Sequence, residues 1–306
     1  MAKIDFLTLA DFDRAELDSM LEAAARLKRE WRAGEAGAPL RGRVLACIFH
    51  KPSLRTRLSF EVGIRQLGGS GLYITDAEIG FGRREAIRDI GGVMSQLVDG
   101  IMIRTFSQEN VVDLARHATI PVVNGLTDAV HPCQILCDLF TLREKGREPD
   151  GLSIAYLGDG NNVAHSWIDA ARVYEIDLRI ATPAGYEPDP TVVARAAGGR
   201  GRVRLVRDPR EAVAGAQVVY TDTWTSMGQE AEAEKRRRAF PPYQVNATLL
   251  RQAAPGALVM HCLPAHRGEE ITDEVIDGPQ SIVYDQAGNR LHGQKGILLH
   301  CLGARR

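Results

Sequence analysis

The feature that most constrains the fold of this chain is a regular alternation of short apolar segments with longer amphipathic ones. The apolar segments, many of them rich in β-branched residues, lie at 44–49, 71–74, 100–103, 120–123, 152–157, 178–181, 203–206, 218–221 and 257–260. Helical patterns fill the gaps, for example at 56–67, 84–97 and 163–174. Such alternation is typical of β–α–β units with parallel strands. The sequence therefore predicts an α/β protein with doubly wound, Rossmann-like parallel sheets.

The length of 306 residues favours two domains, since a domain commonly holds roughly 150 residues. A polar stretch at 143–151, REKGREPDG, divides the alternation into two similar halves. We therefore expect a first domain at 1–147 and a second at 148–287.

Charge and composition argue against several classes of partner. The 38 basic and 39 acidic side chains leave a formal charge of −1, so no overall field favours nucleic acid or an anionic membrane. No apolar run approaches the roughly 20 residues of a membrane span, and the start, MAKIDFLTL, lacks the apolar core of a secretory signal. The five cysteines are odd in number and widely spread, which favours reduced thiols. We expect a cytoplasmic protein with no nucleic-acid or membrane partner.

Metal and cofactor signals are weak. Cys133 and Cys137 stand four apart on an expected helix, but no second cysteine or histidine pair lies nearby at the spacing of zinc ligands. The charge-dense stretch at 231–238, AEAEKRRR, reads as a solvated helix or mobile loop rather than an anion site. We expect neither a metal nor a cofactor.

An anion site is predicted after the first apolar segment, in HKPSLRTRLSFE. Ser53 can cap a helix that begins near Leu54. The backbone amides of its first turn, two hydroxyls and two guanidinium groups would then surround one point, as a phosphate requires. These side chains belong to Ser53, Thr56, Arg55 and Arg57. The alternative is an ordinary capped helix with two surface arginines.

Two later segments of the first half carry further candidates. Arg104 follows a buried strand, so a long cation can reach a ligand from a rigid base. His131 and Gln134 open a helix and stand one turn apart. An imidazole there can donate to a developing oxyanion while the carboxamide accepts from an NH₂ group. Alone, Arg104 is weak evidence, and a lone His-Pro pair is more often simple helix capping.

In the second half, LGDGNNVAHSW reads as a strand, a glycine-rich turn and a helix. Gly158 and Gly160 fit a dinucleotide-binding turn, but Val163 stands in place of its third glycine, so that signal is weak. Asn161 and Asn162 instead suit the carboxylate and ammonium of an amino acid.

Two further strand ends in the second half carry reactive groups. Asp222 and a turn at 226–228 that can flex follow one strand. Cys262 follows the next, and the alternative for it is an inert buried thiol.

Taken in order, these segments resemble the transcarbamoylase family, and within it the members that act on ornithine. The motifs are SLRTR at 53–57, MIRT at 102–105, HPCQ at 131–134, GDGNN at 158–162, DTWTSMG at 222–228, HCLP at 261–264 and NR at 289–290. The resemblance implies transfer of the carbamoyl group of carbamoyl phosphate to the δ-amine of L-ornithine. The products would be L-citrulline and phosphate, in arginine biosynthesis or arginine catabolism.

The resemblance also implies roles for individual residues. Carbamoyl phosphate would be bound by Ser53, Leu54, Arg55, Thr56, Arg57, Arg104, His131, Gln134, Cys262, Leu263 and Arg290. Ornithine would be bound by Asn162, Asp222, Ser226 and Met227. The catalytic residues would be Arg104, His131, Gln134, Asp222 and Cys262. The first domain would bind carbamoyl phosphate and include a returning C-terminal helix at 288–306, the second would bind ornithine, and the subunits would form a homotrimer or a multiple of trimers.

The chain departs from the family pattern at Glu78, where a glutamine or histidine usually reaches carbamoyl phosphate of the neighbouring subunit. Because a carboxylate there would repel the phosphate, we expect Glu78 to pair with Arg83 or Arg84, which then faces the ligand. Leu54 replaces a frequent hydroxyl residue, which leaves only its backbone amide to bind.

Three alternatives remain for the function. The nearest is a sister transcarbamoylase acting on putrescine, an acylated ornithine or aspartate. A nicotinamide-dependent dehydrogenase would reuse the Gly158 turn but leaves SLRTR and HPCQ unexplained. A non-catalytic phosphate-binding module would keep SLRTR but has no need of His131 or Cys262.

Overall fold

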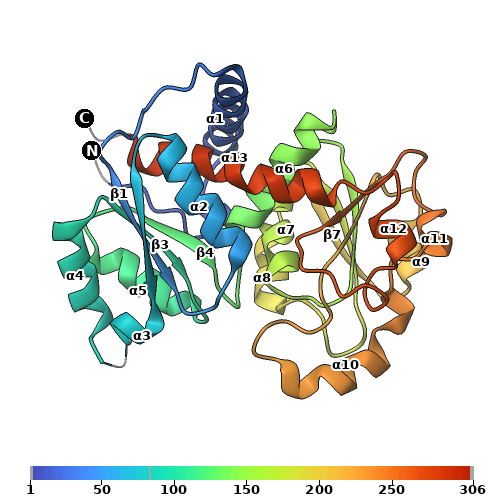
Figure 1. Ribbon diagram of the computed structural model, residues 1–306. Helices are drawn as coiled ribbons and strands as arrows, with labels where there is room; N and C mark the ends of the chain where they lie inside the picture. Colours follow the sequence, from blue (N-terminus) through green and yellow to red (C-terminus); the bar gives the residue numbers. More distant parts are fainter. Residues whose placement is uncertain (1–2, 83, 304–306) are drawn as a thin grey trace. The chain divides into compact units, whose positions relative to one another are not determined.

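The computed structural model describes residues 3–82 and 84–303 (Figure 1). The chain forms two compact units: unit 1 comprises Met1–Phe140 and Gly288–Arg306, and unit 2 comprises Thr141–Ala287. The divisions fall inside two helices, α6 (Pro132–Glu144) and α13 (Val283–Leu302). The prediction that the C-terminal helix returns to the first half is confirmed, since α13 from Gly288 onward belongs to unit 1.

Unit 1 is built on a four-stranded parallel sheet with the strand order β2-β1-β3-β4. The strands are β1 (Val44–Phe49), β2 (Ser70–Thr75), β3 (Gly100–Arg104) and β4 (Val122–Leu126). The helices of this unit that precede α6 are α1 (Arg14–Ala33), α2 (Leu54–Gln66), α3 (Asp76–Ile79), α4 (Ile87–Leu97) and α5 (Gln108–His117). Isoleucines of β1 and β3 pack with apolar side chains of α4 and α5 to form one core of the unit. The α/β prediction is confirmed for this half.

Unit 2 is built on a five-stranded parallel sheet with the strand order β7-β6-β5-β8-β9. The strands are β5 (Ser153–Leu157), β6 (Asp177–Ala181), β7 (Arg202–Val206), β8 (Val218–Thr221) and β9 (Leu258–His261). Its helices include α7 (Asn162–Val173), α8 (Pro190–Ala196), α9 (Pro209–Val213), α10 (Ala233–Ala239), α11 (Ala247–Leu250) and α12 (Asp273–Ile276). A large apolar core joins side chains of β5, β8 and β9 to α9, α11 and α12.

Each apolar segment that the sequence marks as a strand forms one of β1 to β9, within two or three residues of its predicted bounds. The helix predicted at 84–97 begins only at Ile87. The preceding residues form a turn, with Gly80 and Gly82 at positive φ and a bridge between Phe81 and Glu85. The polar stretch at 143–151 overlaps the end of α6, which continues to Glu144.

The order of the strands shows where ligands can collect. In each sheet the later strands are added on the opposite side of the first strand from the earlier ones. The strand order therefore reverses between β1 and β3 in unit 1 and between β5 and β8 in unit 2. Doubly wound sheets bind ligands at the carboxyl ends of the strands that flank such a point.

Of the helices in the described ranges, none combines the length and apolar character that crossing a membrane requires.

Candidate active site

The segment after β1 forms a capped helix N-terminus, as predicted. Ser53 is the N-cap of α2 in extended backbone geometry, and its hydroxyl oxygen accepts from the backbone N–H of Thr56 at 3.3 Å. The same hydroxyl donates to Oγ1 of Thr56 at 3.0 Å. Because α2 begins at Leu54, the backbone N–H groups of its first turn lie after the carboxyl end of β1. The positive end of the helix dipole at this place favours an anion.

Two buried arginines converge on the hydroxyl of Thr56. Arg104, the last residue of β3, donates to Thr56 Oγ1 at 3.4 Å, and Arg290 of α13 donates to the same atom at 3.3 Å. Arg290 also donates to Oε1 of Gln134 at 2.5 Å, and Gln134 donates to Asp138 at 2.8 Å. Both guanidinium groups are at least nine-tenths buried. Two positive charges buried around one hydroxyl favour an anionic ligand.

His131 lies beside this cluster, immediately before α6. Its side chain is buried, and the pKa of His131 is held well below the usual value by burial and by the charges of Arg290 and Arg104. The imidazole is therefore neutral near pH 7 and offers one N–H donor. A neutral donor suits an oxygen that becomes negative during a reaction.

Arg57 stands apart from the other predicted phosphate ligands. Its exposed guanidinium pairs with Glu61 at 3.2 Å and lies 3.8 Å from the ring centre of Tyr73. Arg55, two residues earlier, is half-buried. The described contacts of Arg57 are thus with its own helix and with β2, rather than with the hydroxyl of Thr56.

The carboxylate of Glu78 has a local structural role. It accepts from the backbone N–H of Thr75 at 2.6 Å and from the Thr75 hydroxyl at 2.7 Å, which caps α3 and lowers the pKa of Glu78. Arg84 donates to the backbone carbonyl of Glu78 at 2.9 Å, whereas we expected it to pair with the carboxylate. Arg83, the other expected partner, lies outside the described residues.

In unit 2, a second cluster forms around the buried carboxylate of Asp222, directly after β8. Its Oδ2 accepts from the amide of Asn161 at 2.8 Å, and its Oδ1 accepts from the backbone N–H of Thr223 at 2.8 Å. Asn161 is in turn fixed as the N-cap of α7 and receives the hydroxyl of Tyr156 at 3.0 Å. Asn161, which the sequence offered only as a possible ligand, is thus a support for Asp222.

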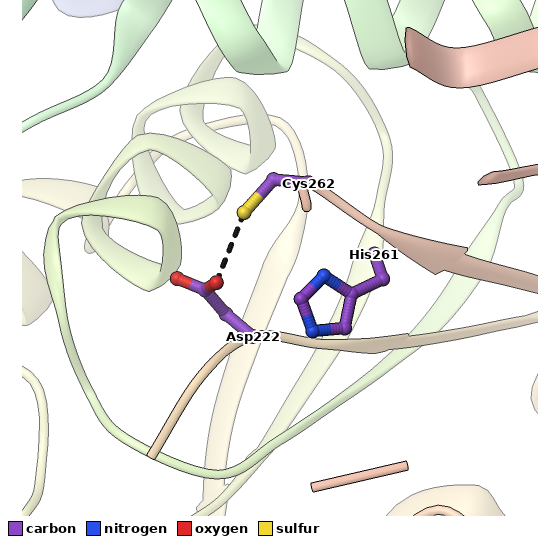
Figure 2. Close-up of side chains that lie close together, drawn as sticks. All are labelled: Asp222, His261 and Cys262. Atoms are coloured by element: carbon purple, nitrogen blue, oxygen red, sulfur yellow. Dashed lines mark hydrogen bonds between the residues drawn. The ribbon is translucent and has the colours of Figure 1, made fainter. Parts of the chain in front are cut away.

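The thiol of Cys262 points at Asp222 and donates to its Oδ1 at 2.9 Å (Figure 2). His261 lies next to this pair, and possible metal-ligand atoms of the three residues lie within 4.8 Å of one another. Both ring nitrogens of His261 have other partners, however: Glu270 at 3.0 Å and the backbone N–H of Leu263 at 2.9 Å. Through these contacts the imidazole of His261 stabilises the loop that carries Cys262 and Leu263.

The remaining predicted ornithine ligands lie on neighbouring loops of unit 2. Asn162, the first residue of α7, is half-buried, as is Ser226. Met227 is largely exposed and is followed by Gly228 at a φ of +94°. The structure therefore places Asp222 and Cys262 in contact and leaves Ser226 and Met227 on a more exposed turn.

Sequence reasoning missed one residue of this region, Arg236. It lies in the stretch predicted to be a solvated face, yet it is buried and forms an ion pair with Asp159 at 2.9 Å. The sequence carries a signal of this burial: Phe240, the C-cap of α10, follows Arg236 by four residues, and both are buried, so one face of this short helix packs inward.

Gly160 shows why the turn after β5 needs glycine. A Cβ there would lie 2.2 Å from the backbone nitrogen of Pro188 and 2.4 Å from the backbone carbon of Glu187. We expect Gly160→Ala to lower the free energy of unfolding by about 3 kcal/mol, because backbone must move to admit the methyl group. Gly92→Ala is the control, since its Cβ meets nothing within 4 Å. Thermal or denaturant unfolding of both variants tests this, and equal stability would contradict it.

Comparison with known proteins covers both clusters. The family model "Aspartate/ornithine carbamoyltransferase, carbamoyl-P binding domain" matches residues 4–144, and "Aspartate/ornithine carbamoyltransferase, Asp/Orn binding domain" matches residues 150–301. The chain belongs to the aspartate/ornithine carbamoyltransferase family. This membership confirms the resemblance seen in the sequence motifs.

Relatives in the aspartate/ornithine carbamoyltransferase family match the chain nearly end to end. An ornithine carbamoyltransferase of Symbiobacterium thermophilum is 56% identical over 298 residues, which is 96% of each chain. One of Thermococcus kodakarensis is 51% identical over 307 residues, covering 99% of this chain and 98% of the relative. The solved ornithine carbamoyltransferase of Pyrococcus furiosus superposes with a TM-score of 0.96 at 48% identity, covering 100% of this chain and 99% of that one. These matches confirm the predicted fold of two parallel-sheet units.

Proposed function

We propose that this chain transfers the carbamoyl group of carbamoyl phosphate to the δ-amine of L-ornithine, giving L-citrulline and phosphate. The observation that carries the proposal is that relatives named ornithine carbamoyltransferase match the chain over both polar clusters at about half identity. The proposed metabolic role of this reaction is arginine biosynthesis or arginine catabolism.

Carbamoyl phosphate is proposed to bind in unit 1. The phosphate takes the N-terminus of α2 with Ser53, Leu54, Arg55, Thr56 and Arg57, together with Arg104 and Arg290. The two buried guanidinium groups around Thr56 support this assignment, because their positive charges attract and hydrogen-bond a dianion. Gln134, with Cys262 and Leu263 of unit 2, is proposed to hold the carbamoyl NH₂ group. When the substrate binds in this way, Oε1 of Gln134 gives up its hydrogen bond from Arg290 and accepts one from the carbamoyl NH₂ group.

The reaction requires charge stabilisation more than a covalent nucleophile. Attack of a neutral amine on the carbonyl carbon forms a C–N bond and moves an electron pair onto the carbonyl oxygen. Collapse of this tetrahedral species breaks the C–O bond to phosphate, which leaves with the electron pair and can accept the proton that the attacking nitrogen loses. Arg104, Thr56 and the neutral imidazole of His131 are proposed to donate to the developing oxyanion, and the arginines to the leaving phosphate.

Ornithine is proposed to bind in unit 2, through Asn162, Asp222, Ser226 and Met227. The contact between Asp222 and the Cys262 thiol supports this assignment, since it holds a carboxylate ready for an ammonium group. The δ-amine of ornithine is protonated at neutral pH, so a partly desolvated place beside Cys262 would favour its reactive neutral form.

A citrulline assay tests the proposal directly. Purified protein is supplied with carbamoyl phosphate and, in turn, L-ornithine, putrescine, an acetylated ornithine and L-aspartate. We expect the highest kcat/KM with L-ornithine. A higher value with any of the other amines would instead assign the chain to a sister transcarbamoylase.

A homotrimer, or a multiple of trimers, is the proposed assembly. Leu54, Leu58 and Val62 form an exposed apolar stripe at spacing four along α2, and Leu72 on edge strand β2 is also exposed. Exposed apolar stripes of this kind favour burial against another subunit.

The free state of the five cysteines supports the proposed cytoplasmic setting.

Leu58→Glu is expected to shift the protein from trimer to monomer, because a carboxylate would be buried against apolar surface. Light scattering coupled to size-exclusion chromatography measures the mass. Val112→Glu on α5 is the control, since it adds the same charge at another exposed apolar site of unit 1. An unchanged mass for Leu58→Glu would exclude this face from the subunit contact.

A further inference from the structure

Arg236 is the buried charge of an otherwise exposed stretch. Within 231–238, the neighbouring charged side chains of Glu234, Lys235, Arg237 and Arg238 are exposed, whereas Arg236 is only 5% exposed. Its guanidinium lies against the ring of Tyr186, 4.9 Å from the ring centre. A charge held this deeply requires partners that fix its position.

The guanidinium of Arg236 has one local partner, Glu232, which accepts from its Nε at 3.2 Å, and two partners on different loops. Its Nη1 lies 2.9 Å from Oδ2 of Asp159 and donates to the backbone carbonyl of Trp224 at 2.8 Å. Asp159 lies in the loop after β5, and Trp224 lies in the loop after β8. One nitrogen of one side chain thus joins the two loops that flank the reversal point of the sheet in unit 2.

Both loops carry the cluster around Asp222. Asn161 follows Asp159 by two residues and donates to Asp222, while Trp224 follows Asp222 by two residues on the other loop. Burial raises the pKa of Asp159 to about 6, and the charge of Arg236 opposes this rise. Removing Arg236 would leave a buried carboxylate without its cation and free the carbonyl of Trp224, so the two loops would lose their shared anchor.

We infer that Arg236 and Asp159 form a positioning pair, which holds the Asp222–Gly228 loop against the Gly158–Asn162 loop in the geometry that binds the amine acceptor. The inference rests on the proposed use of unit 2 to bind ornithine. Neither residue is required to touch the substrate, because each acts through the backbone and side chains of the loop that it anchors.

Arg236→Met tests the pair in the full-length protein, since methionine keeps an unbranched stem and removes the charge. Arg238→Met is the matched control, because it makes the same change two residues later at an exposed ion pair with Glu234. We expect Arg236→Met to raise the KM for ornithine about 100-fold, as a small displacement of a binding loop can do, with a smaller change in kcat. Its affinity for carbamoyl phosphate, from equilibrium titration, should stay within about twofold of the control, because the proposed phosphate ligands other than Cys262 and Leu263 belong to unit 1.

Two further variants separate positioning from general destabilisation. Arg236→Lys keeps a cation for Asp159 and should restore part of the ornithine affinity. If Arg236→Met folds poorly, adding Asp159→Asn removes the uncompensated carboxylate, and the raised KM should persist in the folded double variant. Equal loss of affinity for both substrates in Arg236→Met would show a merely structural role and overturn the inference.

Limited proteolysis gives a readout that needs no activity. A glutamate-specific protease can cut after Glu230 and Glu232, both exposed, and should cut Arg236→Met faster than Arg238→Met without substrate. An equal cutting rate would overturn the holding role. A wild-type protein that is inactive on ornithine would refute the proposed function. An active wild type with equal ornithine KM in both variants would refute the role of Arg236 alone.

Discussion

Replacing Arg104 with alanine is expected to lower kcat/KM for carbamoyl phosphate by several orders of magnitude while the fold survives. The guanidinium of Arg104 is buried and contacts Thr56, at the place where the proposed phosphate and carbonyl oxygen meet. Charge-assisted hydrogen bonds at this point strengthen as negative charge moves onto the oxyanion and the leaving phosphate. Steady-state citrulline formation at varied carbamoyl phosphate measures the loss.

Three arginines of α2 provide comparisons for the Arg104→Ala variant. Arg55→Ala should have an effect of similar size, because Arg55 lies in the first turn of the helix. Arg57→Ala should cost less, since the described contacts of Arg57 are with Glu61 and Tyr73. Arg65→Ala, at the exposed end of the same helix, is the control. Kinetics close to wild type in Arg104→Ala would remove Arg104 from the site.

Asp222→Ala is expected to abolish efficient use of ornithine while carbamoyl phosphate still binds. If Asp222 pairs with the α-ammonium of ornithine and Asn162 binds its α-amino-acid end, putrescine lacks the groups that these two residues bind. A missing partner of this kind can lower kcat/KM by a factor of about 10⁴. We therefore expect the wild-type protein to prefer ornithine over putrescine by about that factor.

The control for this second prediction lies in the other unit. Equilibrium titration of Asp222→Ala with carbamoyl phosphate should give an affinity near that of the wild type, because the proposed phosphate ligands other than Cys262 and Leu263 belong to unit 1. Putrescine carbamoylated as efficiently as ornithine would move the protein to a sister activity. The argument for the arginine cluster around Thr56 would be unaffected by that result.

The sequence predicted the strands well because their signal is local. A short run such as 218–221 is apolar in all but its last position, and it forms β8 with every residue buried. The helix expected from 84 was wrong at its start, since the positive φ of Gly80 and Gly82 and the bridge from Phe81 to Glu85 are properties of the folded turn. Periodicity carries no information about such a turn.

Residues that face each other across loops were harder to predict. The sequence spacing of Asp159 and Arg236 does not indicate their ion pair, because they are far apart in the chain. The same holds for Asn161, whose amide supports Asp222. Glu78 shows the opposite case: its role is local, as the capping partner of Thr75, and a threonine three residues before a glutamate is the sequence pattern of such a capping box.

The course of α13 has a consequence for the order in which the protein matures. Arg290 closes the arginine cluster of unit 1, yet it is reached only after the whole of unit 2 has been synthesised. A nascent chain that carries only the first stretch of unit 1 therefore lacks one of the two arginines around Thr56 and the helix that packs against Gly63. We expect the phosphate site to become competent late, so that binding of the anion reports on a chain whose synthesis is nearly finished.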